Sequence, residues 1–148
     1  MKKAILILIL CVSFIFLSGC LNSNNELNHD ELNHDTLKRL LRSNGFSNVD
    51  TREGGYNILT VRPRVINASG ELLVVYEFDS NEEMRSDASL VDRDGARIER
   101  PAGGWINMTW NGTARWFKGG RIIVIYTGHN EEIINFLMDN LELFAGEF

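Results

Sequence analysis

Two apolar runs constrain the fold of this 148-residue chain more than any other feature. One is Leu-Leu-Val-Val-Tyr-Glu-Phe at residues 72–78, and the other is Arg-Ile-Ile-Val-Ile-Tyr at residues 121–126. Each follows a glycine-containing turn, at residues 67–70 and 119–120. Short apolar runs bounded by turns favour strands over helices, which need a longer stretch. We therefore expect a domain built on a sheet, with residues 72–78 as a central strand.

Three further segments are expected to be strands. Residues 57–66 alternate apolar and polar side chains, and Pro63, which cannot donate to a ladder, favours an edge or a bulge. Residues 105–110 alternate in the same way, and Asn111-Gly112 after them is a strong signal for a tight hairpin turn. The return strand is expected at residues 113–118.

Helix signals stand near both ends and in the middle of the chain. Leu37, Leu40 and Leu41, with Gly45 after them, predict a short amphipathic helix with a glycine stop. Ser80-Asn-Glu-Glu83 has the spacing of a capping box and predicts a helix start. Asn130-Glu-Glu opens a last helix, whose apolar residues are expected to face inward: Ile133, Ile134, Leu137, Met138, Leu141 and Phe144.

These elements predict an α+β fold, with an antiparallel sheet of about five strands and helices on one face. Residues 74–84 and 124–133 resemble each other, since each has a strand, a tyrosine and then Asn-Glu-Glu. One interpretation is that any junction from strand to helix favours asparagine and acids. The other is a twofold architecture of two hairpin–helix units. The sequence leaves both open.

The first twenty residues have the three parts of an export signal. Lys2 and Lys3 are followed by an apolar run from Ala4 to Leu17, and Leu17-Ser18-Gly19-Cys20 closes the segment. The run has 14 residues, fewer than the roughly 20 of a spanning helix. A cysteine directly after Leu-Ser-Gly is typical of a lipobox, so residues 1–19 are expected to be cleaved and Cys20 to carry diacylglycerol. Two acyl chains suffice for stable anchoring.

A polar segment follows the cysteine. Residues 20–35 are interpreted as the lipidated Cys20 and a flexible tether, and residues 36–148 as one domain. The pentapeptide Glu-Leu-Asn-His-Asp occurs at residues 26–30 and again at 31–35, in a segment too poor in apolar residues to fold alone. A metal site at His29 and His34 is the less favoured alternative.

Charge and cysteine content narrow the class of protein. Cleavage would remove two of the 15 basic residues and none of the 20 acidic ones, leaving a formal charge of −7. This argues against a nucleic-acid partner. Cys11 would be lost with the signal and Cys20 consumed by lipid. The domain therefore has no disulfide, and its core alone must stabilise it.

No catalytic pattern stands out in the domain. His129, its only histidine under these boundaries, lies at a helix start, and a cap or an exposed residue explains it better than a base. Asp79, Glu82, Glu83 and Asp87 are explained most simply by a solvated helix face. A close pair of acids as in a glycosidase stays open, because such partners need only meet in space. We expect no cofactor and no metal.

Residues 93–121 differ from the rest of the chain, since they concentrate arginines and hold all three tryptophans. Exposed aromatic side chains beside arginine are typical of recognition surfaces. The candidate binding surface is the expected hairpin with Trp105, Arg115, Trp116 and Lys118. The alternative is that a tryptophan covers a second face of the sheet beneath a loop.

Several segments carry a resemblance to a group of small bacterial lipoproteins and lipoprotein-like domains. They are Tyr76-Glu-Phe78, Ser86-Asp-Ala-Ser89, Asp94-Gly95, Trp110, the run from Trp116 to Gly128, and Phe144-Ala-Gly146. The resemblance spans residues 72–146. Ala114-Arg115-Trp116 stands where that group has Pro-His-Phe, so no role of that histidine passes to Arg115. The resemblance implies a lipoprotein domain and adds no substrate.

Together these patterns predict a lipid-anchored module on the extracytoplasmic face of the cell membrane. We expect a non-catalytic binding or interaction role, with an envelope protein as a candidate partner. The alternatives are a small carboxylate-dependent envelope hydrolase and an accessory subunit of an envelope sensor or transporter.

Overall fold

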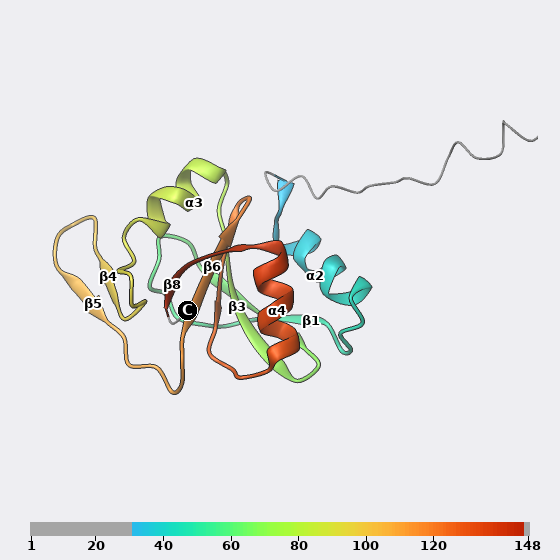
Figure 1. Ribbon diagram of the computed structural model, residues 1–148. Coiled ribbons are helices and arrows are strands. Elements are labelled where there is room, and N and C mark those ends of the chain that lie inside the picture. The colour runs from blue at the N-terminus through green and yellow to red at the C-terminus, as the bar shows by residue number, and fades with distance from the viewer. Residues whose placement is uncertain (1–30, 147–148) are drawn as a thin grey trace, which may run out of the picture.

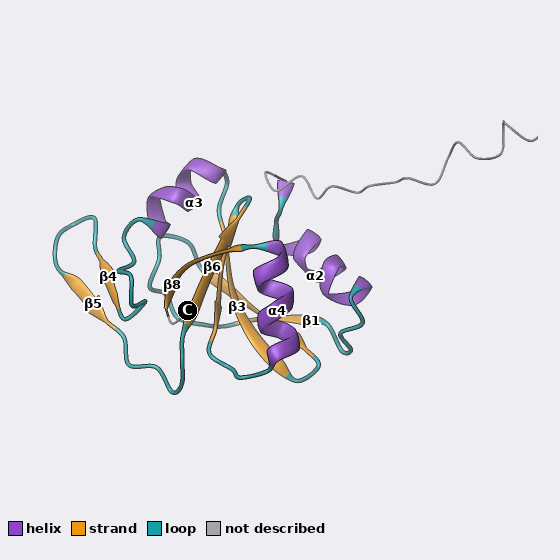
Figure 2. Ribbon diagram, in the orientation of Figure 1, coloured by secondary structure: helices purple, strands orange, loops and turns teal. Residues whose placement is uncertain are grey.

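An antiparallel sheet of six strands forms the body of the molecule (Figure 2). The computed structural model describes residues 31–146. The strand order is β1-β2-β3-β7-β6-β8, and every neighbouring pair is antiparallel. The bounds are Asp50–Glu53 (β1), Pro63–Ala68 (β2), Glu71–Glu77 (β3), Arg115–Gly119 (β6), Ile122–Tyr126 (β7) and Glu142–Gly146 (β8).

Strand β7 is buried along its whole length. It lies between β3 and β6, and all five of its residues are buried. Successive side chains of a strand point to opposite faces of the sheet. Accordingly Val124 and Tyr126 belong to one hydrophobic core, whereas Ile123 and Ile125 belong to a second one. A sheet with two apolar faces needs a cover on each side.

Two helices cover the first face (Figure 1). Helix α2 (His34–Ser43) contributes Leu37 and Leu41, and helix α4 (Glu131–Asn140) contributes the buried residues Ile133, Phe136 and Leu137. Asn130 caps α4, since its side-chain oxygen accepts from the backbone N–H groups of Glu132 and Ile133. The sequence-based assignment of this cap is therefore confirmed.

The second face has a mixed cover. Helix α3 (Asn81–Ala88) packs Met84 and Ala88 onto this core, and Ser80 caps the helix by accepting from the N–H of Glu83. The loop of residues 57–62 and the long connection from α3 to β6 supply the rest. This connection includes strands β4 (Arg97–Glu99) and β5 (Trp105–Asn107), which form a separate two-stranded ribbon at the side of the molecule (Figure 1).

The α+β class is confirmed, and two details differ from the expectation: the number of strands and the placement of the helices. Within the described residues the main sheet has six strands, and α3 lies on the face opposite to α2 and α4 because both faces of β7 are apolar. The hairpin–helix connectivity does occur twice, as β2-β3-α3 and β6-β7-α4. Because the two helices cover opposite faces, the units are not equivalent in space.

Two expected strands were wrong in extent or partner. Residues 57–62 form a loop, and β2 begins only at Pro63. The loop packs against the second face of the sheet, where Tyr76 Oη donates to the carbonyl of Tyr56 (2.5 Å) and Thr60 donates to Asp87. Residues 105–107 pair with β4 and not with residues 113–118, because β6 already has β7 and β8 as neighbours.

The ordered domain begins before residue 36. Leu32 is 0% exposed and lies in the first core, and the side chain of Asn33 caps α2 by accepting from the N–H of Thr36. The backbone N–H of Arg121 also donates to the carbonyl of Leu32 (2.8 Å). The second pentapeptide, residues 31–35, therefore belongs to the fold and not to a tether. The proposed signal, Cys20 and residues 21–30 lie outside the described residues.

Substitution of the two equivalent leucines tests this boundary. Leu32→Ala removes a fully buried side chain and is expected to lower the free energy of unfolding by about 2–5 kcal/mol. Leu27→Ala makes the same change in the preceding identical pentapeptide and is expected to have little effect. Urea denaturation of both variants measures the difference. Equal losses would contradict the assigned boundary.

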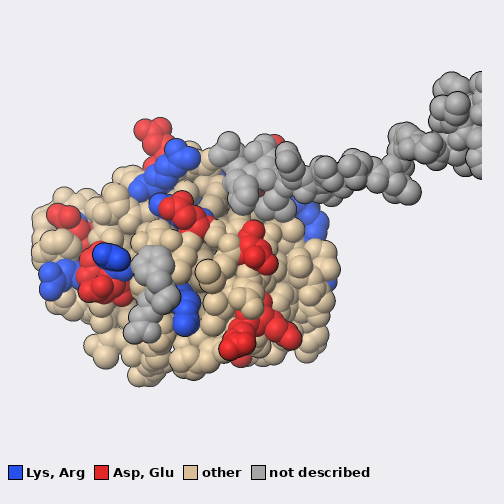
Figure 3. All heavy atoms as spheres, viewed as in Figure 1, with Lys and Arg blue, Asp and Glu red and all other residues tan. Residues whose placement is uncertain are grey.

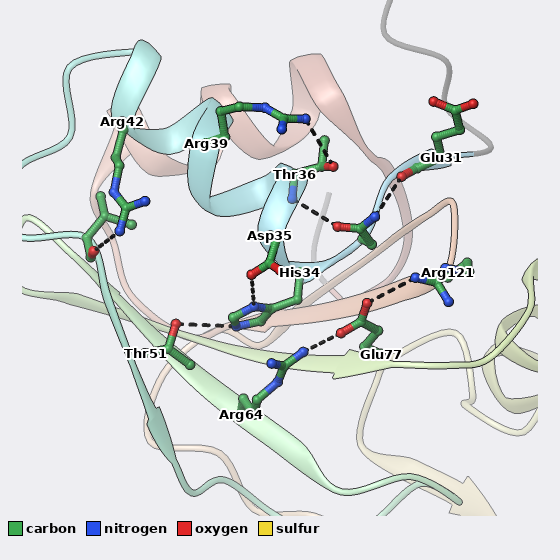
Figure 4. Close-up of polar contacts among 12 residues, drawn as sticks. Glu31, His34, Asp35, Thr36, Arg39, Arg42, Thr51, Arg64, Glu77 and Arg121 are labelled. Carbon is green, nitrogen blue, oxygen red and sulfur yellow. Dashed lines mark hydrogen bonds and ion pairs between the residues drawn. The ribbon is translucent and has the colours of Figure 1, made fainter.

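A polar cluster joins the start of α2 to the sheet (Figure 4). His34 is 1% exposed, and its Nε2 lies 3.5 Å from Thr51 Oγ1 on β1. Beneath it, Glu77 of β3 binds the guanidinium groups of both Arg64 and Arg121. Burial lowers the pKa of His34, and the charge of Arg64 lowers it further, while Asp35 and Glu77 act in the opposite direction. The folded state therefore favours the neutral ring.

Stability is expected to depend on pH through His34. The unfolded chain binds this proton below about pH 6.5, whereas the folded chain binds it only at lower pH. The contribution of neutral His34 to the free energy of unfolding is thus complete above about pH 6.5, and it is lost as the pH falls toward the pKa of His34 in the folded chain. The free energy of unfolding should drop less between about pH 7.5 and 5.5 in His34→Gln than in the unmodified chain.

His129→Gln is the matched control, because His129 is exposed. It should follow the pH profile of the unmodified chain. Parallel profiles for the His34 variant and the unmodified chain would contradict the assignment.

Candidate functional site

The four residues of the expected binding surface do not lie together. Trp105 is on the ribbon, 53% exposed, whereas Arg115 and Lys118 lie near opposite ends of β6. The register places Arg115 opposite Tyr126, on the first face, and Lys118 opposite Ile123, on the second. The fold therefore divides the expected surface into separate regions.

Trp116 is not part of any surface, so its assignment to one is wrong. Its side chain is 0% exposed, and it packs edge-on against Trp110 and Phe144 in the second core. Both Trp110 and Trp116 donate their indole N–H to the carbonyl of Gly95, at 2.9 and 3.2 Å. A Cβ at Gly95, whose φ is +66°, would lie 2.6 Å from Trp116 Nε1. The alternative interpretation, a tryptophan covering a second sheet face, is the observed arrangement.

The side chain of Arg115 lies against the chain segment that leads into α4. Its Nη1 lies 3.4 Å from the carbonyl of Gly128, beside Tyr126. Tyr126 Oη donates to Glu71 (2.7 Å) and accepts from the N–H of Asn130 (3.1 Å). Burial, and then the hydrogen bond to Glu71, raises the pKa of Tyr126 to about 12, so the phenol stays protonated at neutral pH. Tyr126, at the end of β7, therefore holds the start of α4 through its bond with the N–H of Asn130.

Trp105 is the exposed part of a well-anchored ribbon. The Arg97 guanidinium lies 5.4 Å from the centroid of its ring, a cation–π distance. At the base of the ribbon Ile98 is buried and bridges to Val91, while the N–H of Glu99 donates to the carbonyl of Leu90. The tryptophan is therefore presented to solvent from a fixed base.

A hollow of about 340 Å³ lies beside the ribbon. Apolar side chains predominate, and Glu99 and Arg100 supply charge. We call it the ribbon hollow; its lining is Asn57, Ile58, Leu59, Thr60, Leu90, Glu99, Arg100, Pro101, Ala102 and Ile106. The sequence did not reveal residues 57–60 as part of a site, because their alternation resembles a strand.

Asp87 holds one wall of the ribbon hollow in place. It is 5% exposed, and one carboxylate oxygen accepts from both the N–H (2.8 Å) and the hydroxyl (2.7 Å) of Thr60. The expectation that Asp87 lies on a solvated face is therefore wrong, since the loop folds over that part of α3. Asp79, Glu82 and Glu83 are exposed as expected.

A second hollow, of about 420 Å³, lies between α3, the β6–β7 turn and the end of α4. Lys118 reaches it, with Nζ 3.1 Å from Glu142 Oε1 and 5.2 Å from the centroid of the Phe144 ring. We call it the helix hollow; its lining is Asn81, Met84, Arg85, Lys118, Gly119, Gly120, Met138, Asp139, Leu141 and Glu142. Of the four predicted surface residues, Lys118 is the one that lines either of these two hollows.

Charges on the visible face are intermixed (Figure 3). Acidic and basic side chains alternate over it, and neither sign forms a continuous field. Among residues 31–146 no group of three or more His, Cys, Asp or Glu side chains is arranged to hold a metal ion. His129 is exposed. In the same part of the chain, no helix has the length and apolar character required to cross a bilayer.

Comparison with known proteins gave no match: no protein-family model, no curated protein and no solved structure is similar to this chain.

Two tryptophan variants distinguish core from surface. Trp116→Ala is expected to cost about 3–5 kcal/mol of unfolding free energy, because it opens a cavity in the second core. Trp105→Ala removes an exposed ring and should change that free energy by no more than about 1 kcal/mol. Urea denaturation followed by far-UV circular dichroism checks both. Similar losses would contradict the assigned environments.

Proposed function

We propose that the protein is a lipid-anchored interaction module of the extracytoplasmic membrane face, which binds an envelope protein through the β4–β5 ribbon. The observation that carries the binding role is Trp105, exposed and in contact with Arg97 on a ribbon whose Glu99 and Ile106 line an apolar hollow. The location is supported by the sequence Leu17-Ser18-Gly19-Cys20 after a basic and then apolar leader.

Several properties favour the ribbon as a contact surface. Tryptophan and arginine are enriched among the residues that contribute most to interface affinity. Here the cation–π contact limits the rotamers of Trp105, so less side-chain entropy is lost when a partner binds. The ribbon hollow next to it offers apolar lining for a partner side chain.

The hydrolase alternative gains no support from the acids of either hollow. It requires two close carboxylates in a concave site, with at least one of them buried. Among the described residues, Glu99 lines the ribbon hollow and Asp139 and Glu142 line the helix hollow, and all three are exposed. The buried Asp87 is occupied by the N–H and hydroxyl of Thr60. The accessory-subunit alternative uses the same ribbon surface. It differs from the proposed role only in that the bound protein would be an envelope sensor or transporter.

Site-specific photocrosslinking in bacterial cells tests the contact surface. A photoreactive residue at Ala102, exposed beside the ribbon hollow, is expected to capture one dominant protein in the full chain. Adding Trp105→Ala should reduce that capture about tenfold or more, since such anchors commonly contribute about 2 kcal/mol. The same probe at Asn135, exposed on α4, is the control and should not capture that protein. Capture that is insensitive to Trp105 would contradict the proposal.

Cys20→Ser tests the anchor separately. The unmodified chain is expected in the detergent phase after phase separation and to incorporate labelled fatty acid, and the variant should lose both properties, because serine offers no thiol for diacylglycerol. Unchanged partition with no label in either protein would exclude lipid anchoring at this residue. Neither result depends on Trp105.

A further inference from the structure

We propose that the helix hollow binds the zwitterionic backbone of an amino acid or short peptide with an apolar side chain. This goes beyond the interaction role proposed above, since the helix hollow and the ribbon hollow share no residue. Four features of the lining support it: its apolar base, an internal ion pair, two further charges of opposite sign, and its size.

The apolar part of the lining comes from α3 and from the end of α4. Met84 and Leu141 are buried, whereas Met138 is 55% exposed. An exposed methionine over a hollow is an unbranched, adaptable side chain that can close on apolar groups of different shape. This part of the lining suits an aliphatic side chain.

One ion pair is internal to the lining. Lys118 Nζ lies 3.1 Å from Glu142 Oε1 and is held over the ring of Phe144. Lys118 and Glu142 therefore neutralise each other, and the aromatic contact keeps the ammonium in place. A ligand that carried only one sign of charge would have to break this pair to use either partner.

Two charges in the lining have no ion-pair partner within residues 31–146. They are Arg85, on α3, and Asp139, near the end of α4. A guanidinium binds a carboxylate through two parallel hydrogen bonds, and an aspartate accepts from an ammonium. The hollow thus offers one group of each sign, which matches the α-carboxylate and the α-ammonium of a zwitterion.

Size limits the ligand. A hollow of about 420 Å³ lies at the small end of the usual range for small-molecule sites, roughly 300–1,000 Å³. It suits an amino acid or a peptide of two or three residues. A free amino acid and a short peptide share this chemistry, so the experiment must separate the two sources.

Calorimetric titration of the purified full chain in detergent tests the proposal. The probes are leucine, leucyl-leucine, N-acetyl-leucine, leucinamide and N-acetyl-leucinamide. The two zwitterions are expected to bind best, each singly blocked compound about tenfold more weakly, and the doubly blocked one not measurably. Tighter binding of leucine identifies a free amino acid, and tighter binding of leucyl-leucine identifies a peptide.

Two variants test which ligand group each unpaired charge binds. Arg85→Gln should weaken leucine and N-acetyl-leucine but not leucinamide, and Asp139→Asn should weaken leucine and leucinamide but not N-acetyl-leucine. Both residues are exposed, so folding should be retained, and Arg93→Gln outside the hollow is the control. Equal binding of the doubly blocked compound, or no binding of any probe at millimolar concentration, would overturn the proposal. Trp105→Ala should leave these affinities unchanged, so failure here is distinct from failure of the ribbon surface.

Discussion

The burial of β7 on both faces is the constraint on which the rest of the structure depends. Its five residues contribute alternately to two cores, so neither side of the sheet can remain open to water. α2 and α4 cover one side with regular helical faces. The other side is completed by α3, by the loop of residues 57–62 and by the long connection from α3 to β6, in which the structure has only the short strands β4 and β5.

The non-helical segments over the second core are held by side-chain hydrogen bonds, because they lack the internal backbone hydrogen bonds of a helix. The carbonyl of Gly95 accepts from the buried indole of Trp116 and from the partly buried indole of Trp110, and the lack of a Cβ at Gly95 lets Trp116 approach its backbone. Asp87 performs the corresponding role for the loop of Thr60. Both attachments satisfy polar groups that would otherwise be buried unpaired, at a cost of about 1–3 kcal/mol each. They also leave the ribbon as the part of the cover that can project from the body, and that is where Trp105 is exposed.

Local signals in the sequence predicted local structure well, and contacts between distant residues were the part they missed. Caps at Ser80 and Asn130 follow from neighbouring backbone groups, and the apolar run of β7 reports its own burial. The pentapeptide that holds Leu32 is identical to the one before it, so no local signal predicts the burial of Leu32, which depends on its contact with the first core. Likewise Trp105 and Trp116 both occur in alternating segments. The partner of each strand, β4 in one case and β7 with β8 in the other, decides which ring is buried.

The two proposed surfaces lie at different distances from the point where the domain would meet its anchor. Leu32 packs near Gly119, which lines the helix hollow, whereas the ribbon lies on the far side of the molecule (Figure 1). Ten residues separate Cys20 from Glu31. The sequence predicts that this segment is a tether, and a tether of that length would have an end-to-end distance of only about 16–19 Å. A lipid anchor at Cys20 would therefore keep the helix hollow close to the membrane and let the ribbon extend away from it. This arrangement favours a small ligand for the first surface and a protein partner for the second, because a large partner needs access that the nearby bilayer restricts.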